Sequence, residues 1–294
     1  MQAWILSVIL LLCSALAQAD TAVWRISKVS DQLLIGGTVH LLPPAQYPLP
    51  AEFDAAFQHS DVLVLETDLA PMQDQARAAS LQQQLLYPAG TTLSSKLAEK
   101  TRQQLQDILQ RHRLSLPQVE QFRPGMLVTQ LTLLELQQHN FSAPGVDQHY
   151  LTLAQQQKKT LKYLEPIEFQ LSLLAGLGEG REDLFLQHAL SDVSETAKMM
   201  AKALSAWRSG DLAAVEQLVL APVKTADAQT YQQMFVARNQ AWLPQIQALF
   251  GNKEQEFVLV GLGHLAGTEG VLALLQQAGY QVEPFKSGSD KTTE

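Results

Sequence analysis

The chain of 294 residues contains a single cysteine, Cys13. That cysteine follows the apolar run Trp4–Leu12 and precedes Ala17-Gln18-Ala19, a small-x-small cleavage site. These features are typical of a secretory signal peptide, which we predict at residues 1–19. The mature chain then has no disulfide, no thiolate ligand and no thiol nucleophile. Any metal site in it must be built from His, Asp and Glu side chains.

Long apolar runs and basic clusters are also absent from the rest of the sequence. No later run reaches the roughly 18–20 apolar residues needed to cross a bilayer, so we predict a mature protein with no membrane span. With the signal peptide, this predicts a soluble exported protein, which in a bacterium means the periplasm. The formal net charge is −8 and no basic patch is present, which argues against nucleic acid as a partner.

Three common catalytic motifs are missing as well: the G-x-S-x-G nucleophile elbow, the P-loop and H-E-x-x-H. What the sequence does have is a pair of matching turns, Gly37–His40 and Gly261–His264, each of which directly follows an apolar run. Each pattern predicts a buried strand that ends in a glycine turn and carries a histidine just past its end. Ligands of open α/β sheets bind at this edge of the sheet.

A carboxylate occurs in the same context between the two turns. The run Asp61–Leu65 predicts a buried strand, and Glu66 follows it directly. Two imidazoles and a carboxylate at strand ends are the parts of a metal or an acid–base site. Asp68 lies two residues further on and shares the face of Glu66 if the strand continues. It either joins the site or caps the next segment.

Arg238 is notable for its position in a predicted helix. In the segment Tyr231–Trp242 it lies on the apolar stripe, three residues after Phe235. A buried guanidinium needs anionic partners, although the stem of an arginine can also lie on a core with its head in water. In the first case, Arg238 and its neighbour Asn239 point at the site, where they bind an oxyanion or orient Glu66.

The order of the predicted elements indicates an α/β fold. A hairpin of strands at 23–26 and 32–35 begins the mature chain, and strands at 257–260 and 280–285 end it. Apolar residues recur at helical spacing between about 73 and 250. We predict a central mixed β-sheet formed by the N- and C-terminal segments, with a large helical insertion between them. The predicted domain spans residues 20–286, and the polar tail 287–294 is predicted to be disordered.

The five other histidines lie among polar residues, and we predict that they are solvated surface groups. They are His59, His112, His139, His149 and His188.

Taken together, the motifs resemble those of the TraB/GumN family, to which the animal Tiki proteins are related. The resemblance runs over nearly the whole mature chain and rests on Leu34–His40, Asp61–Asp68, Gly145–Asp147, Arg238-Asn239 and Val260–Leu265. It implies a fold similar to erythromycin-esterase-like and ChaN-like proteins. It also implies a divalent-metal-dependent peptidase with His40, His264 and Glu66 at its site, supported by Arg238 and Asn239. Asp147 matches a further family position with no assigned role.

The leading hypothesis from the sequence is therefore a periplasmic metallohydrolase that acts on peptide or protein substrates. The ion (Mn²⁺, Co²⁺ or Zn²⁺) would lie between His40, His264 and one or more carboxylates and would lower the pKa of a bound water. Glu66 would ligate the ion or accept the proton, and Arg238 would stabilise the oxyanion. Two alternatives remain: a non-catalytic haem- or peptide-binding regulatory protein on the same scaffold, and a structural member without activity.

Overall fold

The computed structural model describes residues 21–287 of the chain, so the predicted signal peptide and residues 288–294 of the predicted tail lie outside the described part. A six-stranded sheet forms the centre of the molecule, in the order β6-β4-β7-β2-β1-β8. Its strands are β1 (Val23–Lys28), β2 (Asp31–Thr38), β4 (Val62–Thr67), β6 (Thr160–Glu165), β7 (Glu256–Gly261) and β8 (Gln281–Pro284).

The sheet is mixed, as predicted. Strands β2, β7, β4 and β6 run parallel, whereas at one side β1 pairs antiparallel with β2, and β8 pairs antiparallel with β1. The apolar runs of β4 and β7 are buried almost throughout, as expected for strands covered on both faces. Because the four parallel strands share a direction, their carboxyl ends meet at one edge of the sheet.

In the sheet, strands from the two ends of the chain alternate, which the sequence does not indicate. The sequence suggests a β-α-β unit of β2, α1 (Ala51–His59) and β4, and these two strands are indeed parallel. However, β7 from the C-terminal region lies between them and pairs with both. The middle of the chain contributes β6 at the sheet margin.

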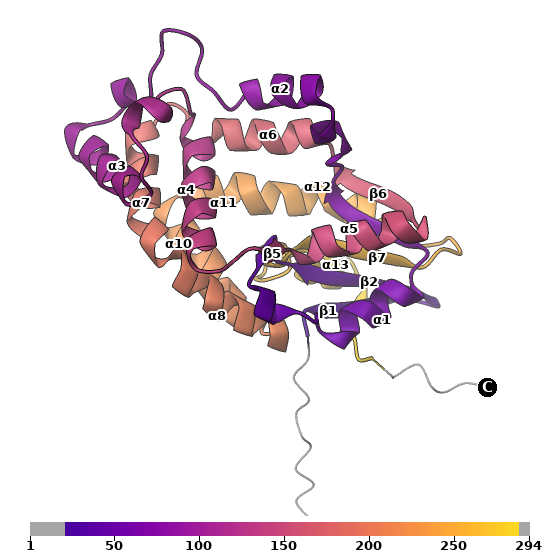
Figure 1. The fold of residues 1–294 in the computed structure, drawn as a ribbon. Helices are drawn as coiled ribbons and strands as arrows, with labels where there is room; N and C mark the ends of the chain where they lie inside the picture. Colours follow the sequence, from indigo (N-terminus) through magenta and orange to yellow (C-terminus); the bar gives the residue numbers. More distant parts are fainter. Residues whose placement is uncertain (1–20, 288–294) are drawn as a thin grey trace, which may run out of the picture.

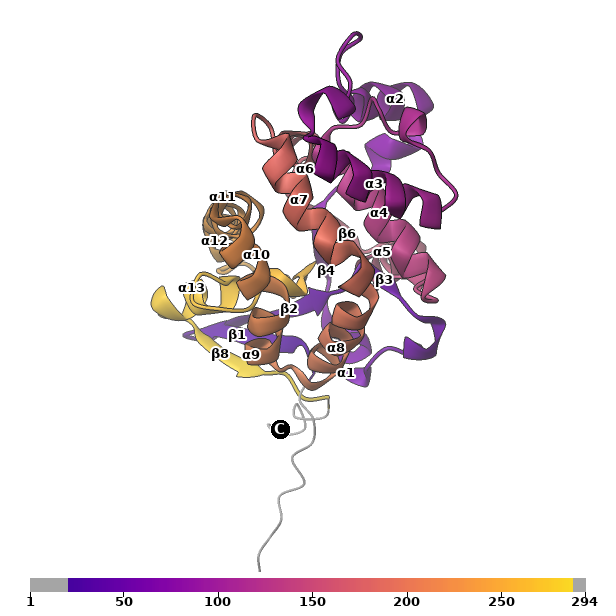
Figure 2. The same ribbon diagram turned by 90° about the vertical axis from the view of Figure 1, so that its left-hand side faces the viewer.

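Helices cover both faces of the sheet. α1 and α5 (Val146–Gln157) pack on one face, while α12 (Ala237–Gln247) and α13 (Val271–Gln277) lie on the other (Figures 1 and 2). On the first face, Phe53 of α1 and Tyr150 of α5 both contact Phe257 of β7, with ring centroids 6.3 and 6.1 Å away. These aromatic contacts fix α5 against the strands whose ends carry the site.

A second, smaller apolar core is packed between α3 (Glu99–Arg111), α4 (Pro124–Gln138) and α7 (Glu182–Asp192). By contrast, α8 (Thr196–Ser209), α9 (Leu212–Val215) and α11 (Ala228–Tyr231) contribute buried residues to the main core. The other helices are α2 (Gln75–Gln83), α6 (Ile167–Gly176) and α10 (Ala221–Ala226). None of the described helices is both long and apolar enough to cross a membrane.

One histidine prediction is wrong. The side chain of His112 is 2% exposed, and its Nε2 lies 3.3 Å from Oε2 of Glu135 on α4. Its neighbours in the sequence are polar, so the sequence suggests a surface position. The packing of α4 against the end of α3 buries the ring instead, beside a carboxylate that is itself largely buried.

Candidate active site

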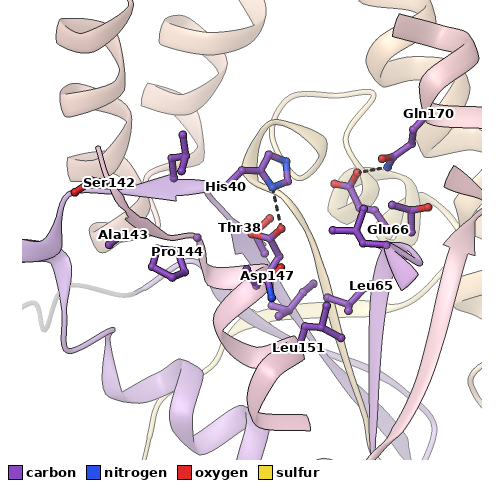
Figure 3. Close-up of a pocket in the computed structure, with 16 residues that line it drawn as sticks. Thr38, His40, Leu65, Glu66, Ser142, Ala143, Pro144, Asp147, Leu151 and Gln170 are labelled. Atoms are coloured by element: carbon purple, nitrogen blue, oxygen red, sulfur yellow. Dashed lines mark hydrogen bonds and ion pairs between the residues drawn. The ribbon is translucent and has the colours of Figure 1, made fainter. Parts of the chain in front are cut away.

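A cavity of about 570 Å³ opens at the carboxyl edge of the parallel strands. Four polar side chains that line it are His40, Glu66, Asp147 and Gln170 (Figure 3). His40 follows β2 and Glu66 lies near the end of β4, as the strand pattern predicts. Asp147 comes from the first turn of α5 and Gln170 from α6. The cavity thus collects residues that are separated by more than a hundred positions in the sequence.

His40 projects into this cavity, and solvent reaches 68% of its side chain. Its Nδ1 lies 3.1 Å from Oδ2 of Asp147 (Figure 3). Gly145 makes this approach possible, because a Cβ there would fall 2.4 Å from the backbone carbonyl of His40. The amide of Val146 also donates to the carbonyl of Val39, at 3.1 Å. The start of α5 is therefore fixed directly against the turn that carries His40.

Asp147 determines the charge of His40. The attraction of its carboxylate, together with their hydrogen bond, raises the pKa of His40 from 6.5 to about 9. Burial within the surrounding protein opposes this shift, and water in the cavity screens the attraction. Asp147 lies in the first turn of α5, where the helix dipole favours a negative charge. The pair therefore orients the imidazole with Nδ1 toward Asp147, which leaves Nε2 for the cavity.

Glu66 is held from three sides, and its side chain is only 13% exposed. Its Oε1 accepts from the amide of Gly261 at 2.6 Å. Its Oε2 accepts from Nη2 of Arg238 at 2.6 Å and from Nε2 of Gln170 at 3.2 Å. Burial alone would raise the pKa of Glu66, but its surroundings of His264, Arg238, His40 and the Gly261 amide lower it to about 2. Because His264 is itself neutral, as described below, the positive charges that favour the carboxylate are those of Arg238 and His40.

Arg238 lies behind Glu66 and is 6% exposed. It is the second residue of α12, which follows a π-helical turn at Gln232–Val236. A guanidinium has five N–H groups, and the protein offers an acceptor for each of them. Nε donates to Glu165; Nη1 faces Met234 O and His264 Nε2; Nη2 donates to Glu66 and Glu165. No donor of Arg238 remains for an oxyanion in this arrangement, so its role is to orient Glu66.

His264 is buried beside Arg238 and uses both ring nitrogens within the protein. Its Nδ1 lies 2.6 Å from Oδ1 of Asn239, and its Nε2 lies 2.9 Å from Nη1 of Arg238. Since the guanidinium can only donate, Nε2 must accept and Nδ1 must carry the proton. The rings of Trp242 and Phe235 flank it, with centroids at 4.5 and 5.2 Å. Burial lowers the pKa of His264 to about 3, so the ring is neutral.

The model of the TraB/PrgY/gumN family matches residues 22–284, which is most of the chain.

The chain belongs to the TraB/PrgY/gumN family.

This membership confirms the family resemblance noted from the sequence motifs. No curated protein and no solved structure matches the chain significantly. The roles of the residues in this family member must therefore be argued from the site itself.

The structure places the predicted site residues in two groups. His40 and Glu66 line the cavity, whereas Arg238, Asn239 and His264 form a buried layer behind Glu66. Asn239 does not point at the cavity: its Nδ2 donates to the carbonyl of Glu269 at 2.8 Å, and its Oδ1 contacts His264. Asp68 is not among the residues that line the cavity, and its Oδ1 accepts from the amide of Ala70 at 2.9 Å.

Glu165 belongs to the buried layer but was not predicted as a site residue. It ends β6 and contacts Arg238 at 2.6 Å and Nε1 of Trp242 at 2.9 Å. Glu165 ends a strand as Glu66 does, which is a signal that the sequence contains. That strand carries the polar residues Thr160 and Lys162, so it reads less clearly as a buried strand than the run before Glu66.

The donor set does not fit the predicted metal site. Within residues 21–287, no group of three or more His, Cys, Asp or Glu side chains is arranged to hold a metal ion. The lone pair of His264 faces a guanidinium, and the same guanidinium occupies the inner side of Glu66. A divalent cation between these two residues would meet the fixed positive charge of Arg238.

Proposed function

We propose that the cavity is the active site of a hydrolase that cleaves peptide bonds in an exported compartment. The observation that carries the proposal is the His40–Asp147 pair, whose imidazole stands in the cavity beside an ionised carboxylate, Glu66. The compartment rests on the predicted signal peptide at residues 1–19. Family membership supports a shared scaffold and does not itself supply the reaction.

In this reaction His40 acts as the general base. Its Nε2 accepts a proton from a water molecule in the cavity while Nδ1–H donates to Asp147, which holds the required tautomer and stabilises the imidazolium. The water then attacks the substrate carbonyl, and the imidazolium returns the proton to the leaving nitrogen. Because the pKa of His40 is raised to about 9, its neutral, basic form becomes abundant only as the pH approaches 9.

Glu66 serves the same reaction as a fixed hydrogen-bond acceptor. A carboxyl with a pKa of about 2 cannot give up a proton near neutral pH, so it is not the general acid. Its carboxylate can accept from the attacking water or from an N–H of the substrate. Arg238 and Gly261 hold it in place, which fixes the position of that acceptor relative to His40.

The divalent ion predicted from the sequence stays a prediction, and no step of this mechanism uses it. In the observed arrangement, the Nε2 of His40 is the nitrogen open to a ligand, because both nitrogens of His264 are engaged. Dialysis against a chelator, followed by elemental analysis and an activity measurement, tests the ion directly. We expect activity to survive the removal of metal. Loss of activity that Mn²⁺, Co²⁺ or Zn²⁺ restores would establish the metallopeptidase.

The proposal is tested by incubating the mature protein with peptides derived from an unfolded protein and identifying new termini by mass spectrometry. A His40→Ala variant serves as the control. We expect new termini with the wild-type protein and none above background with the variant. Saturable binding of the same peptides without any new terminus would contradict catalysis and favour the non-catalytic binding protein.

A further inference from the structure

The walls of the cavity differ in character from its polar centre. Five leucines from separate segments line it: Leu41, Leu65, Leu69, Leu151 and Leu259. Two of them, Leu65 and Leu151, lie below the His40–Asp147 pair and Glu66 in Figure 3. Aliphatic side chains from strands β3 (Leu41–Leu42), β4 and β7, helix α5 and the loop after β4 therefore surround one side of the polar groups.

Leu69 adds a second observation. It lies in the loop after β4 and is one of the few large apolar side chains that are substantially exposed in the described part of the chain, at 39%. Unlike the others of this kind, Val29, Phe169 and Leu184, it lines the cavity. A ligand that fills the cavity would remove this leucine from water, and the burial of apolar area favours binding.

The charges of the cavity are the third observation. Its lining includes two carboxylates, Glu66 and Asp147, and the described residues that line it include no lysine or arginine. The guanidinium of Arg238 lies behind Glu66 and is fully engaged. An acidic side chain that entered this cavity would lose hydration and meet two like charges, and the imidazolium of His40 is already paired with one of them, Asp147.

We propose that the cavity is a specificity pocket that takes a neutral aliphatic side chain of a peptide substrate and rejects an acidic one. This inference rests on the proposed function for the identity of the ligand as a peptide. The volume of about 570 Å³ is ample for a leucine-sized side chain together with the adjoining peptide groups. His40 and Glu66 then lie beside the backbone of the residue whose side chain enters the pocket.

Blocked alanine-rich peptides that differ only in one central residue, leucine, lysine or glutamate, test the pocket. Their dissociation constants are measured with the His40→Ala variant of the mature protein, and their kcat/KM values with the wild-type protein. We expect the leucine peptide to be favoured over the glutamate peptide by about 10-fold or more in both measurements. Equal binding of the two, a preference for glutamate, or no binding at all would overturn the proposal.

Two matched variants locate the preference. Leu151 and Leu153 both lie on α5 and are both half-buried, but only Leu151 lines the cavity. Leu151→Ala should weaken the preference for leucine several-fold, whereas Leu153→Ala should leave it unchanged. Equal effects of the two variants would place the selection elsewhere and contradict the pocket.

The two proposals fail in different ways. Preferential binding of the leucine peptide without cleavage would leave the pocket standing and remove the hydrolase. Cleavage of all three peptides at equal rates would leave the hydrolase standing and remove the pocket.

Discussion

The two glycine–histidine turns have the same pattern in the sequence and opposite environments in the structure. His40 stands in an open cavity beside a carboxylate, and its pKa is raised. His264 lies in a buried layer between Arg238, Asn239 and two aromatic rings, and its pKa is lowered. The strand-turn-histidine pattern therefore sets where a histidine is delivered, while the helices that pack against each turn set its charge. We interpret the first turn as catalytic and the second as structural support for Glu66.

The largest expected effect is the loss of peptide hydrolysis that follows if His40, but not His264, is the general base. Replacing His40 with alanine should lower peptide hydrolysis by about 10²–10⁴-fold, because a general base contributes this much to the rate. The free energy of unfolding of the His40→Ala variant, measured in urea, should stay close to that of the wild-type protein, since the side chain of His40 is exposed. A His40→Ala variant with undiminished activity would contradict the assignment of the base.

The second expected effect concerns the buried layer. Replacing Arg238 with methionine should destabilise the protein by about 3–5 kcal/mol, because it leaves Glu66 and Glu165 buried without their cation. Urea unfolding measures this cost. As a control, Lys198→Met removes a cation from the exposed pair with Glu195, which should cost no more than about 1 kcal/mol. Similar losses for both variants would mean that the buried layer is not the stabilising network described.

A third effect follows from the lowered pKa of His264. Its neutral form contributes stability that is fully present above pH 6.5 and is lost as the pH falls toward about 3. The free energy of unfolding should fall by up to about 1.4 kcal/mol per pH unit in this window. Glu66, whose pKa is also lowered, adds to the loss only below its ordinary value of 4.5.

The comparison that isolates His264 is made between pH 6.5 and 5. We expect a His264→Asn variant to be less stable at pH 7 and to show a shallower pH dependence than the wild-type protein. If both proteins lose stability with the same slope, then His264 is not the group that titrates.

The smallest expected effect is a shift in the pH dependence of activity, and it concerns only His40 in the first turn. Replacing Asp147 with asparagine removes the charge that raises the pKa of His40. The acidic limb of the plot of kcat/KM against pH should then move to lower pH by about one unit or more, since His40 then loses its proton at a lower pH. A limb that stays in place would show that Asp147 does not control His40.

Much of the fold could be predicted from local patterns, because buried strands carry unbroken aliphatic runs. The hairpin of β1 and β2 and the strands β4 and β7 were predicted in this way and are confirmed. The pairing of β7 between β2 and β4 was not predicted. It joins residues about two hundred positions apart, and nothing local to either strand specifies its neighbour.

For the site, the positions of several residues could be predicted from the sequence, but their partners could not. Strand ends placed His40 and Glu66 at one edge, and the apolar stripe of its helix placed Arg238 in the interior. The partner of His40 was not predictable from spacing, because Asp147 lies 107 residues away at the start of a helix. The engagement of both nitrogens of His264 likewise depends on Arg238 and Asn239, which only the packed helix brings near.

The most direct test of the account is an NMR titration of the two imidazoles in mature protein with ¹⁵N-labelled histidine. Resonances are assigned with the His40→Ala and His264→Asn variants. The account predicts that His40 titrates above pH 6.5, and that His264 keeps the neutral Nδ1–H form throughout the pH range in which the protein stays folded. A protonated His264 near neutral pH, or ordinary titration of both rings near 6.5, would contradict the distinction between an open catalytic histidine and a buried supporting one.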